Sequence, residues 1–154
     1  MTAAILPVRR NLQFYLPKDK IDNWNGGGAH WTQFMNTLSI FFPAGERFFI
    51  QSIRNYRKDV VDKELKKAVS AFIGQEAFHT REHEEYNEAM VEAGIPIDKM
   101  EANVEKLLAF VQKTLPRPVQ LAVTVSLEHL TAMLADIVME DDRFIKNSDP
   151  HYEA

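Results

Sequence analysis

The chain has 154 residues, of which 45% are hydrophobic and 26% charged, and its formal net charge is −4. These values predict one soluble globular domain, and the acidic balance argues against a nucleic-acid partner. The sequence holds no cysteine, which excludes disulfides, zinc–thiolate sites, iron–sulfur clusters and thiol nucleophiles. Its first apolar run is short and interrupted by Pro7. No apolar run approaches the roughly 20 residues that span a bilayer, so we expect a cytoplasmic protein without a membrane span.

The predicted elements are helices joined by short turns. Residues 1–27 contain two prolines and lead into a run of three glycines at 26–28, so we expect an irregular N-terminal segment. Further on, Pro43 is expected to kink or restart the first helix, and Asp62 and Asp98 are expected to cap the second and third. The four predicted helices are 30–59, 62–94, 98–115 and 118–142, and a polar tail follows at 143–154.

The predicted fold class is all-α. No segment alternates apolar and polar residues as a strand does, and no internal repeat is present. Long helices with short connections favour antiparallel packing in a bundle. We therefore predict a single domain over residues 1–154, built as a bundle of long helices.

Polar residues interrupt the apolar stripe of the second helix. At about 100° per residue, Glu76, His79 and His83 fall within about 60° of one another on one helical face. The same stripe carries Phe72 and Ile73 a turn earlier, so it begins as a buried face. Chemically active side chains are thus predicted where the core should be.

The first and fourth helices repeat this anomaly. Glu46 shares its stripe with Phe42 and Phe49, and Glu128 shares its stripe with Val125. A carboxylate on an apolar face is costly unless another charge compensates it, and a divalent cation compensates it most strongly. Two ligands at i and i+3 can reach one metal, and Glu-x-x-His is the unit of di-iron and di-manganese bundles.

These patterns predict a metal site. Its ligands would be Glu46, Glu76, His79 and Glu128. Oxygen and imidazole donors suit iron, manganese and zinc, and iron is our first expectation.

Each of these residues also has a simpler interpretation. Glu46 could pair with Arg47, and Glu128 could hydrogen-bond to a buried Tyr or Trp. His83 could lie on a solvated charged face, and His129 could be a core histidine. We expect the phenylalanines around Glu46 to pack in the core rather than to form a substrate site: Phe41, Phe42, Phe48 and Phe49. The joint occurrence of carboxylates on three apolar stripes favours the metal site.

Three segments, taken in order, resemble one bacterial family. They read FPAGERFF at 42–49, IGQEAFHTREH at 73–83 and LEHLTA at 127–132, and the opening LPVRR at 6–10 and Trp24 also fit. Over nearly its whole length the chain is similar to the predicted metal-dependent hydrolases, which belong to the ferritin-like group. The resemblance implies a ferritin-like bundle with a di-metal carboxylate site.

By this resemblance, Glu76 would bridge two metals, His79 would complete the first metal's shell, and Glu128 would begin the second. The candidate metal ligands are then Glu46, Glu76, His79, Glu128, His83 and His129. The two last-named histidines are candidates for ligand, hydrogen-bond orienter or proton shuttle.

The sequence departs from the family pattern after Glu128. The family has another helix with a second Glu-x-x-His, whereas the remaining 26 residues contain none. The chain could be a shortened family member, a second copy could supply the missing ligands, or the site could hold one metal. An apolar face left uncovered usually leads to association, so we expect a homodimer or other self-association.

The leading functional hypothesis is a metal-dependent hydrolase of an unidentified small molecule, with Glu128 or His83 as general base. One alternative is a di-iron oxidase or oxygenase, because carboxylate-rich bundle sites suit dioxygen chemistry equally well. Another is a non-catalytic helical metal-binding or interaction protein. The ligands alone do not choose among these functions.

Overall fold

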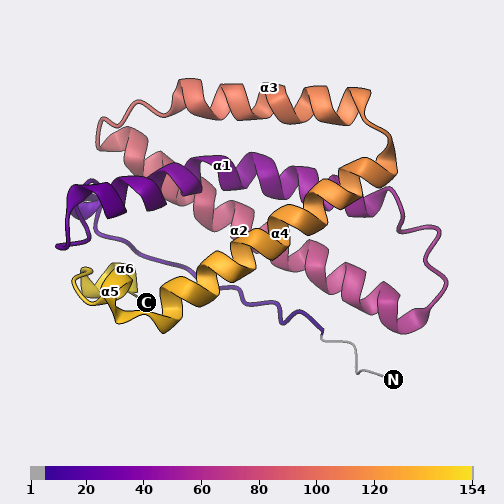
Figure 1. The fold of residues 1–154 in the computed structure, drawn as a ribbon, viewed down its shortest axis with the longest axis horizontal. Helices are drawn as coiled ribbons and strands as arrows, with labels where there is room; N and C mark the ends of the chain where they lie inside the picture. Colours follow the sequence, from indigo (N-terminus) through magenta and orange to yellow (C-terminus); the bar gives the residue numbers. More distant parts are fainter. Residues whose placement is uncertain (1–5, 154) are drawn as a thin grey trace.

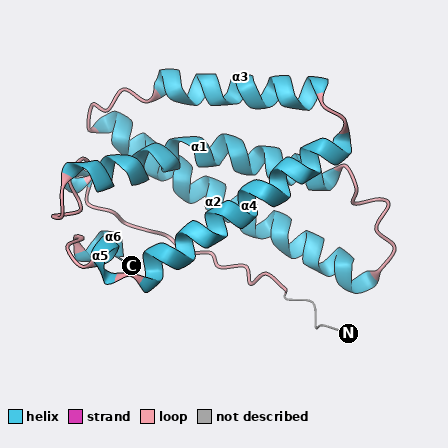
Figure 2. Cartoon of the chain, in the orientation of Figure 1, coloured by secondary structure: helices cyan, strands magenta, loops and turns pink. Residues whose placement is uncertain are grey.

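The computed structural model describes residues 6–153, which form a predominantly helical chain (Figure 1). Figure 2 shows no strand in the described part of the chain. The long helices are α1 (Ala29–Arg54), α2 (Lys63–Glu92), α3 (Asp98–Thr114) and α4 (Arg117–Glu140). Three short elements complete the fold: η1 (Lys18–Lys20), α5 (Asp142–Ile145) and α6 (Pro150–Glu153). The predicted all-α class is confirmed.

Local chemistry sets the ends of α2. The side chain of Asp62 accepts a hydrogen bond from the backbone N–H of Leu65 at 2.7 Å, as expected of an N-cap. At the other end Gly94 adopts a φ of 84°, a conformation that favours glycine, and the N–H of Ile95 donates to the carbonyl of Met90 at 3.0 Å. These bonds satisfy backbone groups that the helix end would otherwise leave without partners.

Two other predicted features differ in detail. Pro43 lies inside α1, which continues through it as one helix. Asp98 is the first helical residue of α3 rather than its cap, because Ile97 takes the N-cap position and buries its side chain in the core. The carboxylate of Asp98 then lies in the first turn, where the helix dipole favours negative charge.

The helix α1 is central to the fold. It packs against α2 most extensively and also contacts α3 and α4, which crosses it obliquely (Figure 1). A small apolar core lies where the residue after η1, the middle of α1, the end of α2 and the α2–α3 turn meet. Its members are Ile21, Ile40, Ala89, Met90 and Ile97.

The helix α4 has an unusual distribution of side chains. Its buried residues are polar, namely Gln120 and Thr124, and the hydroxyls of Thr124 and Ser52 lie 2.7 Å apart. Many of its large apolar residues are exposed: Val119, Val125, Leu127, Leu130, Met133, Ile137 and Met139. Within residues 6–153, α4 alone is long and apolar enough to cross a membrane by length and composition. The expectation of a protein without a membrane span stays a prediction.

The N-terminal segment, residues 6–17, runs along α2. The guanidinium of Arg9 donates to the carbonyl of Ser70 at 2.7 Å, and that of Arg81 donates to the carbonyl of Leu12 at 2.7 Å. Arg9 reaches α2 because position 74 is glycine: a Cβ there would lie 2.3 Å from Nε of Arg9. The segment therefore forms one wall of the molecule beside the second helix.

Candidate metal centre

Three predicted ligands meet between α1 and α2. Nδ1 of His79 lies 3.9 Å from Oε1 of Glu76 and 4.0 Å from Oε1 of Glu46. All three ligand atoms lie within 4.8 Å of one another. The two carboxyl groups are buried, with 3% of Glu46 and 4% of Glu76 exposed, whereas the side chain of His79 is half exposed.

These separations fit a single ion. Oxygen and nitrogen ligands lie about 2.0–2.2 Å from a zinc-sized ion, so two ligands of one ion are at most about 4.4 Å apart. Both distances from Nδ1 of His79 satisfy this limit. The ligand oxygens of the two carboxylates lie within 4.8 Å of each other, so at most a small movement brings them within the limit. Within residues 6–153, this is the one group of His and acidic side chains with ligand spacing.

The electrostatics of the two buried carboxyl groups, Glu46 and Glu76, also favour a bound cation. The pKa of Glu46 is raised to about 8, chiefly by burial and also by the carboxyl groups of Glu76 and Glu128, against the lowering effects of a polar contact with Thr80 and of the charge of Arg47. Burial likewise raises the pKa of Glu76 to about 8, with a further contribution from Glu128. Without a cation, the protein holds these carboxyl groups partly protonated near neutral pH.

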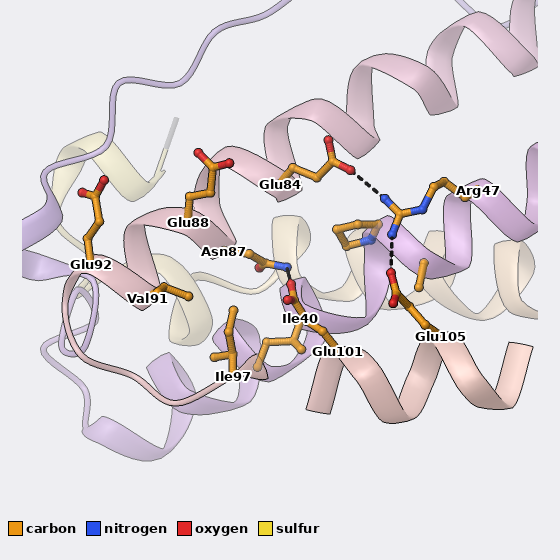
Figure 3. Close-up of a pocket in the computed structure, with 12 residues that line it drawn as sticks. Ile40, Arg47, Glu84, Asn87, Glu88, Val91, Glu92, Ile97, Glu101 and Glu105 are labelled. Carbon is orange, nitrogen blue, oxygen red and sulfur yellow. Dashed lines mark hydrogen bonds and ion pairs between the residues drawn. The ribbon is translucent and has the colours of Figure 1, made fainter. Parts of the chain in front are cut away.

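Within residues 6–153, no arginine forms an ion pair with Glu46. The guanidinium of Arg47 turns away, to Glu84 at 2.6 Å and to Glu105 at 3.1 Å, across an acidic cavity between α1, α2 and α3 (Figure 3). Oε2 of Glu46 is buried and has no hydrogen-bond partner, because the hydroxyl of Thr80 donates to the carbonyl of Glu76. The interpretation of Glu46 as an arginine partner is therefore wrong.

A hydrogen-bond network fixes the orientation of His83. The amide nitrogen of Asn87 donates to the carbonyl of Ser39 at 3.3 Å and to Glu101 at 3.0 Å, both of which only accept. The amide oxygen of Asn87 must then accept from the hydroxyl of Ser39, at 3.0 Å.

This network determines which nitrogen of His83 carries the proton. Because the Ser39 hydroxyl has one proton, its oxygen must accept from Nδ1 of His83, 3.0 Å away. Nε2 of His83 is therefore unprotonated and lies 4.0 Å from Oε1 of Glu46. Burial and the charge of His79 lower the pKa of His83 to about 4, although Glu82 acts in the opposite direction. The ring is therefore neutral at pH 7. The side chain is 32% exposed, so His83 lies at the edge of the cluster rather than on an open solvated face.

Pro43 makes this network possible. In a regular helix the N–H of residue 43 would bond to the carbonyl of Ser39, but proline has no N–H. The free carbonyl instead accepts from Asn87 on α2. Sequence reasoning treated Pro43 as a kink and did not identify Ser39, although Ser39 lies seven residues before Glu46 and so on the same helical face.

The proton of His79 can also be located. The backbone N–H of Arg10 donates to Oε1 of Gln75 at 3.3 Å, so the amide nitrogen of Gln75 donates to Nε2 of His79 at 2.7 Å. The imidazole proton is then on Nδ1, facing the two carboxyl groups. Burial lowers the pKa of His79. Ligation through Nδ1 requires this proton to leave.

Of the two candidate ligands on α4, Glu128 and His129, only Glu128 lies near the metal centre. Glu128 is half-buried, and it lies near enough to the pair for its charge to raise the pKa of both Glu46 and Glu76. Burial raises the pKa of Glu128 itself. His129 is exposed, and the structure does not bring it into the cluster, so its interpretation as a core histidine is wrong.

The aromatic residues around Glu46 divide into two pairs. Phe48 and Phe49 are buried, as expected of core residues. Phe41 is exposed, and Phe42 lies over the ring of His83 with 4.5 Å between centroids. For Phe41 the prediction of core packing is wrong, whereas Phe42 is half-buried and lines a cavity beside the site.

A comparison with known families matches residues 8–154 to the family described as predicted metal-dependent hydrolase. The chain belongs to this family. Searches of curated proteins and of solved structures found no match. The hydrolase family resemblance read from the three motifs is therefore confirmed, and the buried carboxylate and imidazole cluster provides this family member with donors suited to a metal.

Proposed function

We propose that this member of the predicted metal-dependent hydrolases is an enzyme that holds one divalent ion with Glu46, Glu76 and His79. The observation that carries the proposal is the buried Oε2 of Glu46, which lacks any partner beside a second buried carboxyl group. An unpaired buried charge costs several kcal/mol, and metal coordination is one of the few arrangements that offsets the cost.

The remaining residues can be given roles from their geometry. The ion, when bound, would acidify a coordinated water and polarise a carbonyl or phosphoryl oxygen. His83 presents the lone pair of Nε2 to the cluster and would act as a further ligand or orienting group. Its Nδ1–H donates a hydrogen bond to the hydroxyl oxygen of Ser39. This arrangement is the usual one for a ligating histidine.

Glu128 is the better candidate for general base. Its pKa is raised by burial, toward the neutral range where a base is most effective, whereas the pKa of His83 lies at about 4. Glu128 would accept a proton from the attacking water as the water oxygen bonds to the acyl carbon or phosphorus. The same proton would then pass to the leaving group as the scissile bond breaks.

The nature of the metal follows from the donor set. Carboxylate oxygens and imidazole nitrogen suit iron, manganese and zinc, and we propose iron first. We also retain, as a proposal, the grouping with ferritin-like proteins. The donors that the structure brings together serve one ion, so a single-metal site is the simplest form of the proposal.

The test combines elemental analysis with activity. The purified chain is expected to bind about one equivalent of iron, manganese or zinc, and Glu76→Gln should lose it, while Glu84→Gln on the solvent side of α2 should not. The loaded chain should cleave activated carboxyl or phosphate esters at the same rate with and without dioxygen. Oxygen consumption with a visible iron chromophore would instead favour the oxidase. No metal above the level of Glu76→Gln would overturn the proposal.

A further inference from the structure

A large cavity opens beside the metal centre. It has a volume of about 760 Å³ and lies between α1, α2, the N-terminal segment and the C-terminal end of the described chain. His79 and His83 line it near the metal centre, and Glu92 lines it toward the end of α2. At 1.5 Å per residue, the stretch from His79 to Glu92 is roughly 20 Å long. The cavity is therefore elongated and reaches the site at one end.

The walls of the cavity are apolar. Met35, Leu38 and Phe42 line it from α1, and Trp24, Tyr86 and Tyr152 form an aromatic group in its wall. The rings of Trp24 and Tyr152 are stacked at 5.5 Å, and that of Tyr86 meets Tyr152 edge-on at 6.3 Å. The lining therefore offers extensive contact area to an apolar ligand.

The polar atoms of these aromatic residues already have partners. Nε1 of Trp24 and the hydroxyl of Tyr86 both donate to Oδ1 of Asn36, and the hydroxyl of Tyr152 donates to the carbonyl of Pro17. Their hydrogen-bonding capacity is directed into the protein. A ligand in this part of the cavity would be held by apolar contact, and its polar group would be favoured at the histidine end.

The charges around the cavity disfavour anions. Four glutamates line it, Glu82, Glu85, Glu88 and Glu92. The one lysine in the lining, Lys18, forms an ion pair with Glu92, and Arg81, outside the lining, pairs with Glu82 and lies 3.8 Å from Glu85. Among the described residues the four glutamates outnumber these two cations, so a negatively charged ligand would meet a rim of net negative charge.

We propose that this cavity binds the substrate, and that the substrate has an elongated apolar body that is neutral or cationic. The inference rests on the proposed function, because the hydrolysable group would lie at the His79 end. An acidic cavity with aromatic walls selects esters or amides that carry a long alkyl chain or an aromatic group. These compounds would be neutral or would bear an amine, unlike sugars, nucleotides or free acids.

Binding can be tested without activity. The neutral fluorescent probe N-phenyl-1-naphthylamine is titrated into the full chain with chelator present, and is then displaced by 1-hexanol through 1-decanol, octylamine and octanoate. Affinity should rise about fourfold per methylene along the alcohols, as transfer of each CH₂ from water predicts. Octanoate should bind at least about tenfold more weakly than 1-octanol or octylamine, because of the acidic rim.

Two matched variants locate the probe. Met35→Trp fills the cavity and should weaken probe binding at least about tenfold. Met133→Trp makes the same change on the outer face of α4 and should leave binding within about twofold. If Met35→Trp fails to fold, Leu38→Phe, a smaller addition to the same wall, is expected to weaken binding about threefold or more.

The outcomes separate the two proposals. Unchanged binding in the folded wall variant, or octanoate displacing the probe as well as 1-octanol, would overturn the cavity assignment even if the loaded chain cleaves esters. Probe binding that follows the predicted order, in a chain that takes up metal but cleaves no ester of these alcohols, would leave the cavity in place and reject the hydrolase.

Discussion

Replacing Glu46 by glutamine should reveal how much free energy the metal-free site stores. The pKa of Glu46 is about 8 in the folded chain against an ordinary value of 4.5, mainly because of burial. Between these two values the folded state keeps a proton that the unfolded state has lost. The free energy of unfolding therefore falls as the pH rises through this window and is lowest above about pH 8.

The size of the effect follows from the two pKa values. A difference of 3.5, at 1.36 kcal/mol per pH unit, gives about 5 kcal/mol as an upper value for Glu46. This is comparable to the whole stability of many domains, about 5–15 kcal/mol. Water penetration and local relaxation reduce it, so we expect Glu46→Gln to stabilise the metal-free chain at about pH 9 by roughly 2–5 kcal/mol, and to change it little near pH 5.

The assay is urea unfolding followed by circular dichroism across this pH range, with chelator and then with saturating Mn²⁺. With metal the order should reverse, because the native chain gains binding energy that the amide cannot supply. Glu105→Gln, at an exposed carboxylate, is the control: it keeps Glu46, so its difference in stability from the native chain should stay small and nearly constant from about pH 5 to about pH 9. A metal-free Glu46→Gln chain less stable than the native chain at about pH 9 would refute the account of an uncompensated buried carboxyl.

Three further predictions follow from the packing around the site. Ser39→Ala removes the acceptor for Nδ1 of His83 and should weaken metal affinity about 10–100-fold by calorimetry, with little change in helix content. Gly74→Ala should keep or raise the melting temperature, because alanine favours the helix, while displacing Arg9 and speeding hydrogen exchange in residues 8–16; unchanged exchange would contradict this. We also propose that a second copy covers the outer face of α4, so Leu130→Lys should lower the mass measured by sedimentation; a native chain that is already monomeric would reject this proposal.

Periodicity predicted the centre of the site because its ligands lie on stripes that are otherwise apolar. Glu46, Glu76 and His79 could be found in this way, since a helix places residues three and four apart on one face. The helices themselves followed from caps and breakers, as Asp62 and Gly94 show. These signals are local, and single-sequence reasoning captures local signals well.

The features that the sequence did not reveal depend on how distant segments meet. The role of Ser39 requires Asn87 on another helix, and the place of Phe42 in a cavity wall depends on the N-terminal segment that borders the same cavity. The outward apolar face of α4 was also missed, because the inward side of that helix, marked by Glu128, carries the polar residues Gln120 and Thr124 while large apolar residues face solvent. Periodicity alone does not say which of two faces meets the bundle.

The carbonyl that Pro43 leaves free also fixes the register of two helices. If α1 slid past α2 by one turn, about 5.4 Å, that buried oxygen would lose Asn87 and gain no other donor. Leaving it unsatisfied would cost about 1–3 kcal/mol. The hydrogen bond between Ser39 and Asn87 therefore keeps Glu46 opposite Glu76 before any ion binds. The rigidity of the contact between α1 and α2 thus depends on the pyrrolidine ring of Pro43, which has no reactive group.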